Sequence, residues 1–328
     1  MKNLIRISTT DMTRKEWLEE RRKAIGGSDT AGILGQNPYA TPYTIWADKT
    51  RRLPEKEDNE AMRQGRDLEQ YVADRFTELS GKKTRKINAI IKNPKYPFAS
   101  ANIDRSIVNE PSGLECKTTS LLNLKKFKDG EFPFNYYSQS VHYLAVTECT
   151  RWYVAVLILN KDFKIYQLTR FPNDEKPEWC ESSVYVSDEE INALMVEEAK
   201  FWHLVETDTP PQLSGTKPDT DALSAIYRGE NTDDVVNLSA QYPILQKYLG
   251  LKTQIKELEQ QMTKCEQTLK LSLQDAQIGE TGNFLVKWTI QSRTSFDAKQ
   301  FAKENLTLDL SKYYRKTNYR KFEIKEIV

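Results

Sequence analysis

The sequence predicts a mixed α/β protein with a β-sheet core flanked by helices. Three observations lead to this prediction. Apolar residues recur at helical spacing over 60–80, strand-like runs follow between 87 and 119, and a second pair of strand-like runs at 151–171 is followed by another helical segment. Helices and strands that alternate in this way pack as layers around a central sheet.

Capping residues and breakers mark the first helices. A Thr-x-x-Glu capping box predicts a helix over 13–24, and Ser28 is a candidate cap for a short second helix. A proline in the first turn favours a third helix over 42–49. The longer helix over 60–80 is expected to end at Gly81, because glycine adopts the left-handed conformation that closes helices.

Strand-like runs and two more helices follow. Turn residues, alternating patterns and caps predict strands over 87–92, 98–108 and 114–119 in an antiparallel meander, a helix over 135–147, a hairpin over 151–171 and a capped helix over 187–206.

The region after this last helix is expected to be an addition to a compact core. Residues 207–222 are rich in Pro, Ser, Thr and Asp, which is typical of a linker, so we expect a core over 1–210 and a C-terminal extension over 211–328. Strands are expected in the extension at 283–290 and 319–327. These strands are preceded by apolar residues at heptad spacing: Leu251, Ile255, Leu258, Met262, Cys265 and Leu269. This stripe is as compatible with packing on its own chain as with a coiled coil.

Composition excludes several classes of protein. The 328 residues are 29% charged and 38% hydrophobic, with no apolar run long enough to span a bilayer and no signal-peptide pattern, so a cytoplasmic globular protein is expected. A net charge of +1 argues against coating nucleic acid by bulk charge, although it leaves room for local basic tracks. The four cysteines are scattered and only two histidines are present, which disfavours a disulfide framework or a zinc site.

The run GLECKTTS, residues 113–120, carries the most informative chemistry. Side chains alternate along a strand, so Leu114 and Cys116 should face the core while Glu115 and Lys117 share the other face. A carboxylate that holds a hard cation, beside an ammonium that stabilises negative charge, suits a metal-assisted phosphodiesterase, and the Cys116 carbonyl is a further oxygen ligand. Taken alone, the pair is more simply explained as a cross-strand ion pair.

Neighbouring acids strengthen the catalytic interpretation. Asp104 precedes Glu115 across a short turn, where a hairpin would bring the two carboxylates together. Such a pair repels itself unless a cation is bound. Glu69 lies beside the apolar stripe of its helix and could face the same cleft. Taken alone, Asp104 is as well explained by a hydrogen bond to the local backbone. Taken alone, Glu69 is as well explained as a solvated side chain on a helix surface.

Upstream, the run RRKAIGGSD, residues 21–29, suggests an anion site. Glycines allow the backbone to approach a ligand closely, a helix start at Ser28 favours negative charge, and Arg21 can bind a phosphate bidentately. An ordinary capped turn explains the same spacing.

Together these segments resemble the YqaJ-like viral recombinase family, which is similar to lambda exonuclease. The resemblance covers residues 13–170 and lies in an ordered set of short motifs: Trp17, R…IGGSD…ILG at 21–35, G..LE at 65–69, ID at 103–104, LECK at 114–117 and Gln139. FASANID departs from the family's usual pattern before the aspartate.

The resemblance implies a PD-(D/E)xK nuclease core. Asp104 and Glu115 would be the metal ligands, with the Cys116 carbonyl, and Lys117 the catalytic lysine. Glu69 would match the helical acid near the metal, and Gln139 the glutamine of the following helix. The pair that binds a terminal 5′-phosphate would be Arg21 and Ser28.

The resemblance also implies a substrate and partners. Family members use Mg²⁺, with Mn²⁺ as an alternative ion, to degrade one strand of duplex DNA from its 5′ end, leaving 3′ overhangs for phage-type recombination. The lambda-type enzyme is a trimeric ring that works beside a single-strand annealing protein, so a phage or prophage protein in the cytoplasm of a bacterial host is expected. Two alternatives stay open: an endonuclease of the same fold, and a catalytically idle DNA-binding recombination adaptor. A metabolic enzyme is less favoured, since neither GxGxxG nor a P-loop is present.

Overall fold

The chain folds into two compact units. The computed structural model describes residues 3–55, 58–229, 234–305, 308, 311–315 and 324. The units are Met1–Gly229 and Glu230–Val328. The predicted division into 1–210 and 211–328 stays a prediction. The first unit also contains α7 (Lys217–Ile226).

A six-stranded mixed sheet forms the centre of the first unit. Its spatial order is β10-β9-β8-β7-β6-β3. The strands are β3 (Thr84–Lys86), β6 (Arg105–Ile107), β7 (Ser112–Thr119), β8 (Arg151–Ile158), β9 (Asp162–Thr169) and β10 (Ser182–Tyr185). The pairs β7–β8 and β9–β10 are parallel, and the other three are antiparallel.

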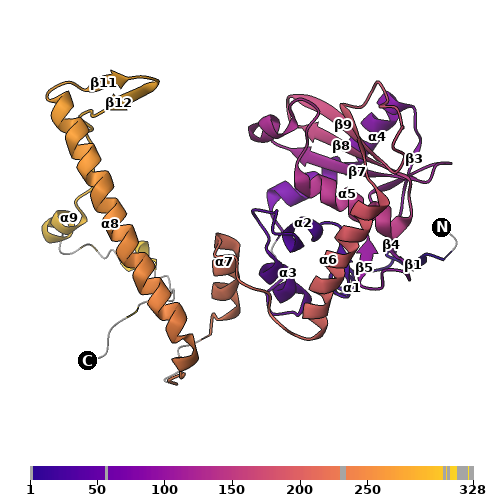
Figure 1. The fold of residues 1–328 in the computed structure, drawn as a ribbon, viewed down its shortest axis with the longest axis horizontal. Helices are drawn as coiled ribbons and strands as arrows, with labels where there is room; N and C mark the ends of the chain where they lie inside the picture. Colours follow the sequence, from indigo (N-terminus) through magenta and orange to yellow (C-terminus); the bar gives the residue numbers. More distant parts are fainter. Residues whose placement is uncertain are drawn as a thin grey trace. The chain divides into compact units, whose positions relative to one another are not determined.

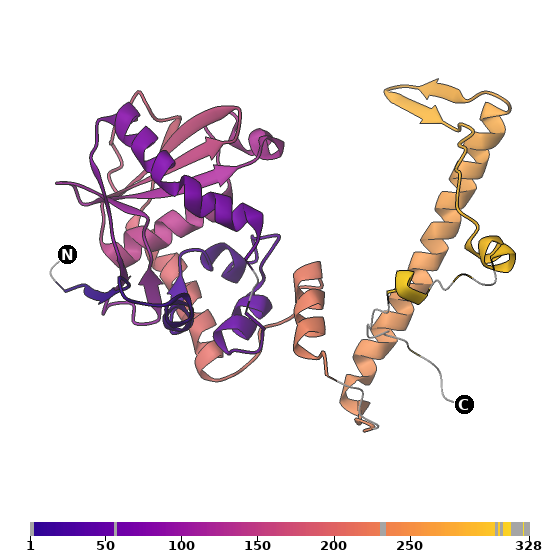
Figure 2. The same cartoon turned by 180° about the vertical axis from the view of Figure 1, so that it is seen from behind.

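Helices cover both faces of this sheet. Figure 2 shows α4 (Glu60–Ser80) across one face and Figure 1 shows α5 (Phe134–Thr147) across the other. The α4 face buries Val72 and Phe76 against Leu114, and the α5 face buries a larger cluster against β8. This arrangement confirms the predicted mixed α/β class with a mixed sheet flanked by helices.

A second, four-stranded sheet lies beside the first in the same unit. Its order is β1-β4-β5-β2, with β1 (Ile5–Ser8), β2 (Ile25–Gly26), β4 (Ala89–Lys92) and β5 (Ala99–Ala101). The remaining helices of the unit are α1 (Arg14–Arg22), α2 (Thr30–Ile33), α3 (Pro42–Lys49), the 3₁₀ helix η1 (Leu121–Phe127) and α6 (Asp188–Glu206). Thr13, Asn59 and Ser187 each cap a helix through a side-chain hydrogen bond.

The predicted antiparallel meander over 87–119 is wrong in one respect. Residues 98–108 form two strands, β5 and β6, that belong to different sheets. The pairs β4–β5 and β6–β7 are antiparallel as predicted, whereas β7 pairs in parallel with β8, because α5 connects them as a crossover and returns the chain to the same edge. The hairpin of β8 and β9 is confirmed.

The second half of the predicted linker is ordered against the first unit. Asp219 of α7 is 2% exposed, accepts from the Thr41 hydroxyl and also accepts from the backbone amide and hydroxyl of Ser214. These bonds fix α7 on α3, so the chain leaves the first unit after α7.

The second unit centres on one long helix, α8 (Tyr242–Leu273), which follows the 3₁₀ helix η2 (Ser239–Gln241). The hairpin of β11 (Ile278–Thr281) and β12 (Phe284–Lys287) comes next, then α9 (Ala298–Glu304) and the 3₁₀ helix η3 (Ser311–Tyr313). The strand expected at 283–290 is shorter, and the strand expected at 319–327 falls, apart from Ile324, outside the described residues. Within the described part of the chain, no helix is long and apolar enough to cross a membrane.

Candidate active site

Strand β7 carries Glu115 and Lys117 on its α5 face, as the alternation predicts. Leu114 belongs to the cluster on the α4 face, and Cys116 packs against it. Glu115 is 5% exposed, whereas 22% of the Lys117 side chain reaches solvent. The carboxylate therefore lies at the bottom of the site and the ammonium nearer its opening.

Gln139 of α5 joins the acid and the lysine. The Lys117 ammonium lies 2.7 Å from Glu115 Oε1 and donates to Gln139 Oε1 at 2.9 Å, and Gln139 Nε2 donates to Glu115 Oε1 at 2.7 Å. Burial opposes the charge of Lys117, but the carboxylates of Glu115 and Asp104 raise the pKa of Lys117 above its ordinary value. Lys117 is thus held protonated and serves as a hydrogen-bond donor.

Asp104 lies next to this trio, immediately before β6. Its Oδ2 accepts from the backbone amide of Cys116 at 2.7 Å, which places its carboxylate at the middle of β7. Burial and the neighbouring Glu115 raise the pKa of Asp104 well above the usual range. Two carboxylates held together in this way gain most from a cation that neutralises both.

One unpartnered oxygen of the site is available to a divalent metal ion. Glu115 Oε2 is buried and has no hydrogen-bond partner among the described residues. Together with Asp104 and the Cys116 carbonyl it would provide a set of hard oxygen ligands. No group of three or more acidic, histidine or cysteine side chains in the described structure is arranged to hold a metal. Mg²⁺ accepts such a sparse set, because it keeps several waters and takes substrate phosphate oxygens.

Glu69 lies near this cluster but has another partner. Arg105, which is 3% exposed, donates to Glu69 Oε1, to the Asp104 carbonyl at 2.7 Å and to Gln70 Oε1 at 3.0 Å. Glu69 still contributes to the raised pKa of Asp104. The structure therefore places Glu69 at the edge of the site, where it positions Arg105 beneath the Asp104 backbone.

Arg21 and Ser28 come together as the phosphate motif predicts. Arg21 Nη2 donates to Ser28 Oγ at 2.9 Å, and the guanidinium lies 4.7 Å from the centre of the Trp17 ring. The predicted helix cap at Ser28 is wrong. The cap position is Asp29, whose carboxylate bonds to the Gly26 amide at 2.9 Å and to Lys49 at 2.7 Å instead of capping the helix.

This correction changes how the turn could hold an anion. Helix α2 has four residues, too few aligned peptides for a substantial dipole. The groups of this turn that could contact a phosphate are therefore the Arg21 guanidinium and the exposed Ser28 hydroxyl.

Gly27 brings this turn directly against the acidic site. A Cβ atom at Gly27 would lie 2.8 Å from the Tyr143 ring and 3.0 Å from Cγ of Gln139, so only glycine fits. The Tyr143 hydroxyl accepts from Gln139 Nε2 at 3.0 Å and donates to the Asn102 carbonyl at 2.9 Å. Asn102 Oδ1 in turn accepts from Trp17 Nε1 at 3.3 Å. The two predicted sites are thus one continuous assembly.

Sequence reasoning missed three members of this assembly. Arg105 could have been found, since it follows Asp104 and alternation turns it toward the helix that carries Glu69. Tyr143 follows Gln139 by one helical turn and so lies on the same face. Asn102 has no local signal, because its role depends on contacts with distant Trp17 and Tyr143.

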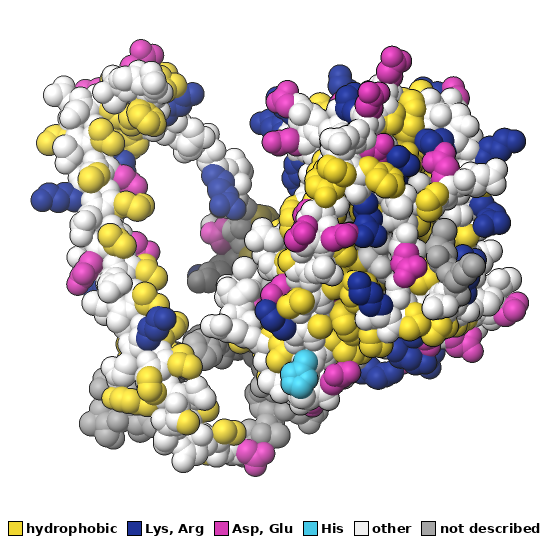
Figure 3. Space-filling model, turned by 45° about the vertical axis from the view of Figure 1, so that its right-hand side comes forward, with side chains coloured by type: hydrophobic (Ala, Val, Ile, Leu, Met, Phe, Trp, Pro, Cys, Tyr) yellow, Lys and Arg dark blue, Asp and Glu magenta, His cyan; other side chains and the backbone are white. Residues whose placement is uncertain are grey.

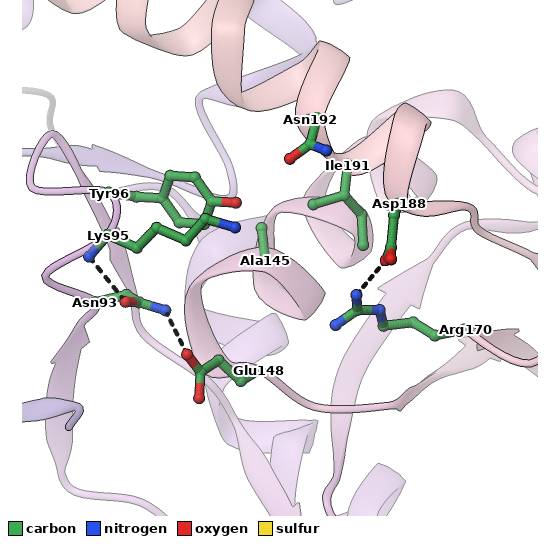
Figure 4. A pocket seen from close by; sticks show the side chains of 9 residues that line it. All are labelled: Asn93, Lys95, Tyr96, Ala145, Glu148, Arg170, Asp188, Ile191 and Asn192. Atoms are coloured by element: carbon green, nitrogen blue, oxygen red, sulfur yellow. Dashed lines mark hydrogen bonds and ion pairs between the residues drawn. The ribbon is translucent and has the colours of Figure 1, made fainter. Parts of the chain in front are cut away.

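A separate cavity of about 270 Å³ lies at the far end of α5 (Figure 4). Arg170 is paired with Asp188, and Asn93 donates to Glu148 at 3.4 Å and accepts from the Lys95 amide at 3.0 Å. None of the predicted site residues lines this cavity. The cavity therefore lies apart from the β7 cluster, which contains the predicted catalytic residues and is the candidate active site.

Comparison with known proteins identifies relatives. Residues 16–150 match the model of the YqaJ-like viral recombinase domain. The protein YqaJ of Bacillus subtilis (strain 168) is 37% identical over 323 residues, which cover 97% of this chain and 96% of that protein.

Two solved structures are also similar. One is the alkaline exonuclease LHK-Exo from Laribacter hongkongensis, at 16% identity and a TM-score of 0.47, covering 60% of this chain and 94% of that chain. Another is a phage-related exonuclease from Haemophilus somnus 129PT, at 12% identity and a TM-score of 0.40, covering 56% of this chain and 96% of that chain. The sequence relationship, which extends over nearly the whole length of both proteins, carries the assignment: this chain belongs to the YqaJ-like viral recombinase family.

Proposed function

We propose that this chain is a metal-dependent deoxyribonuclease of the PD-(D/E)xK type that digests one strand of duplex DNA from its 5′ end. It would use Mg²⁺, or Mn²⁺ as a substitute, and leave 3′ single-stranded overhangs for phage-type homologous recombination. It would act in the cytoplasm of a bacterial host, as a homo-oligomer for which the family resemblance implies a trimeric ring, beside a single-strand annealing protein.

One observation carries this proposal: the convergence of Asp104, Glu115 and Lys117 around an unpartnered buried carboxylate oxygen. Asp104 and Glu115, with the Cys116 carbonyl, would hold the ion. When bound, the cation polarises the attacked phosphate and offsets the charge that develops on the leaving oxygen.

The protein's own groups would orient the reaction. Lys117, protonated and held by Glu115 and Gln139, donates to a phosphate oxygen or to the attacking water. Water then forms the new P–O bond and gives up a proton to solvent, the bond from phosphorus to the 3′ oxygen breaks, and that oxygen takes up a proton from solvent. The strand left behind again carries a 5′-phosphate. Arg21 and Ser28 would bind this new end, so each cut prepares the next.

Placement of the phosphate-binding pair favours cutting from an end. Gly27 packs on Gln139, so an end bound at Arg21 and Ser28 lies beside the catalytic cluster. Three exposed lysines, Lys125, Lys126 and Lys128, follow β7 in and after η1 and would bind the duplex backbone.

The experiment that tests the proposal compares linear duplex DNA with a covalently closed circle, with and without Mg²⁺. We expect Mg²⁺-dependent loss of the linear DNA while the circle stays intact. Nicked or linearised circles would show an endonuclease of the same fold instead. Cleavage of neither substrate, with binding preserved, would leave the DNA-binding recombination adaptor as the explanation.

Arg21→Ala is expected to remove the preference for phosphorylated ends. The wild-type protein should degrade the strand with a 5′-phosphate at least about tenfold faster than one with a 5′-hydroxyl, because a bidentate charged contact contributes about 1.5–3 kcal/mol. In the variant the two rates should converge. The measurement is digestion of a duplex with a phosphate at one 5′ end and a hydroxyl at the other.

Arg14→Ala is the matched control, since Arg14 is an exposed arginine at the start of the same helix. It should retain the wild-type preference. An Arg21→Ala protein that still prefers the phosphorylated end would remove Arg21 from the proposed role.

A further inference from the structure

Helix α8 presents an apolar stripe that its own unit leaves exposed. The stripe consists of Leu251, Ile255, Leu258, Met262, Cys265 and Leu269. Cys265 is exposed, and the exposed fractions of the other five run from 46% to 64%. Ile244 and Tyr248 continue the same spacing toward the start of the helix. Figure 3 shows apolar side chains along the length of α8. No residue of α8 is buried.

The spacing of the stripe is that of a coiled-coil seam. Steps of four and three alternate from Ile244 to Leu269, so each apolar residue falls on an a or d position of a heptad. The helix has 32 residues and is about 48 Å long, which accommodates roughly four heptads. The hairpin that follows contacts α8 at its end, where Gly279 lies against Leu273.

We propose that α8 pairs with α8 of a second copy of this chain as an antiparallel coiled coil. With the two helices fully overlapped, Ile255 faces Leu258 of the second copy and Leu251 faces Met262. Cys265 then faces Tyr248 of the second copy. Every such layer joins an a position to a d position, which is the pattern of an antiparallel pair.

The charges that flank the seam select this direction. In the antiparallel pair, Lys252 meets Glu259 of the second copy twice, once on each side of the twofold axis, and no like charges meet at these positions. In a parallel pair, Lys247 would instead meet Lys252 of the second copy twice. Flanking charges of this kind set partner and orientation in coiled coils. The complementarity is between two copies of one sequence, which identifies the occupant as a second copy of this chain.

The first test measures the molar mass of the full-length protein by light scattering for the wild type, Leu258→Lys and Gln260→Lys. Leu258 lies in a central layer, so its replacement by lysine should halve the molar mass. Gln260 lies on the outer face of the same turn, and its replacement adds the same charge without affecting the mass. A wild type that is a monomer or only a trimer up to about 0.1 mM, or an unchanged mass for Leu258→Lys, would overturn the proposal.

The second test determines whether the two α8 helices pair antiparallel or parallel, and it leaves the apolar seam intact. Lys252→Glu should weaken an antiparallel pair by about tenfold in Kd, because two attractions become two repulsions. Adding Glu259→Lys to it should restore the affinity. In a parallel pair the first substitution would strengthen association by removing the contact between Lys247 and Lys252, so a tighter Kd contradicts the proposal.

Cysteine cross-linking is an independent test of the relative direction of the two helices. Mild oxidation of a Tyr248→Cys protein should link position 248 to Cys265 of the second copy, as mapped by mass spectrometry. A disulfide between the two Cys265 residues in the wild type would show a parallel pair and overturn the proposed direction. Among the other cysteines, Cys149 and Cys180 are buried and Cys116 is only partly exposed, so they compete less than Cys265 for the oxidant.

Discussion

Lys117→Ala is expected to lower Mg²⁺-dependent cleavage of linear duplex DNA by about 10³-fold or more while duplex binding survives. Lys117 is the positive group that reaches both Glu115 and Gln139 and extends toward the opening of the site. Removing one preorganised donor to a charged transition state costs about 10²–10³ in rate, and the loss of a full charge lies at the upper end. The measurement is single-turnover digestion with saturating enzyme, with binding followed separately by anisotropy.

Lys126→Ala is the matched control for this prediction. Lys126 is an exposed lysine in η1, shortly after the same strand. Its loss should weaken binding at higher salt with little effect on the single-turnover rate. If Lys117→Ala cleaved at the wild-type rate, the assignment of the active site to β7 would be wrong.

His142→Ala is expected to destabilise the first unit by about 3–5 kcal/mol, because it leaves a buried carboxylate without its partner. His142 of α5 and Glu198 of α6 are both 0% exposed, and His142 Nδ1 lies 2.8 Å from Glu198 Oε1. The other ring nitrogen lies 2.9 Å from the Ser100 carbonyl. Thr30 of α2 also donates to Glu198 at 3.0 Å, so the pair connects three helices to β5.

The same pair predicts how stability depends on pH. Burial alone would lower the pKa of His142, but the charge of Glu198 and the hydrogen bonds to Glu198 and Ser100 raise it above its ordinary value. A raised folded-state pKa gives stability that is fully present below about pH 6.5 and lost as the pH rises through the folded-state pKa. Urea unfolding at several pH values measures this loss on the alkaline side.

The control for His142 replaces both partners by apolar residues of similar size. The double variant His142→Leu/Glu198→Met should recover much of the lost free energy, because neither charge is then left unpaired. It should also lack the alkaline decline of the wild type. An unfolding free energy for His142→Ala within about 1 kcal/mol of the wild type would show that the pair is not a major support of the fold.

Much of the fold could be predicted because its helices carry local signals. The capping residues Thr13, Asn59 and Ser187 and the closing Gly81 act on neighbouring backbone groups, so the sequence around them suffices. The division of residues 98–108 between two sheets could not be predicted in the same way. It depends on Asn102 and Asp104, whose side chains bond to Trp17 and to the Cys116 amide, far away in sequence.

The candidate site shows the same division between local and distant contacts. Alternation along β7 predicted which face Glu115 and Lys117 share, and the structure places Gln139 against both. The bond between Glu69 and Arg105 and the fit of Gly27 against Tyr143 arise from tertiary packing. Local patterns thus predicted the candidate catalytic groups but not the residues that hold them in place.

Thermal unfolding with and without Mg²⁺, at several pH values, measures whether Asp104 and Glu115 form a cation site. The pKa of Asp104 is raised, so the metal-free protein loses stability as the pH rises through the folded-state pKa of this group. Asp104→Asn removes the ionisable carboxyl group and so this loss of stability. In the absence of metal, the variant should have a higher Tm than the wild type.

Mg²⁺ at about a hundredfold excess over Kd should raise the Tm of the wild type by about 5–10 °C, and this gain should grow as the pH rises through the raised pKa of Asp104, because the carboxylate must lose its proton to bind. The Asp104→Asn variant should gain almost nothing. Equal stabilisation of both proteins by Mg²⁺ would contradict the account, because the ion would then bind somewhere other than this pair of carboxylates.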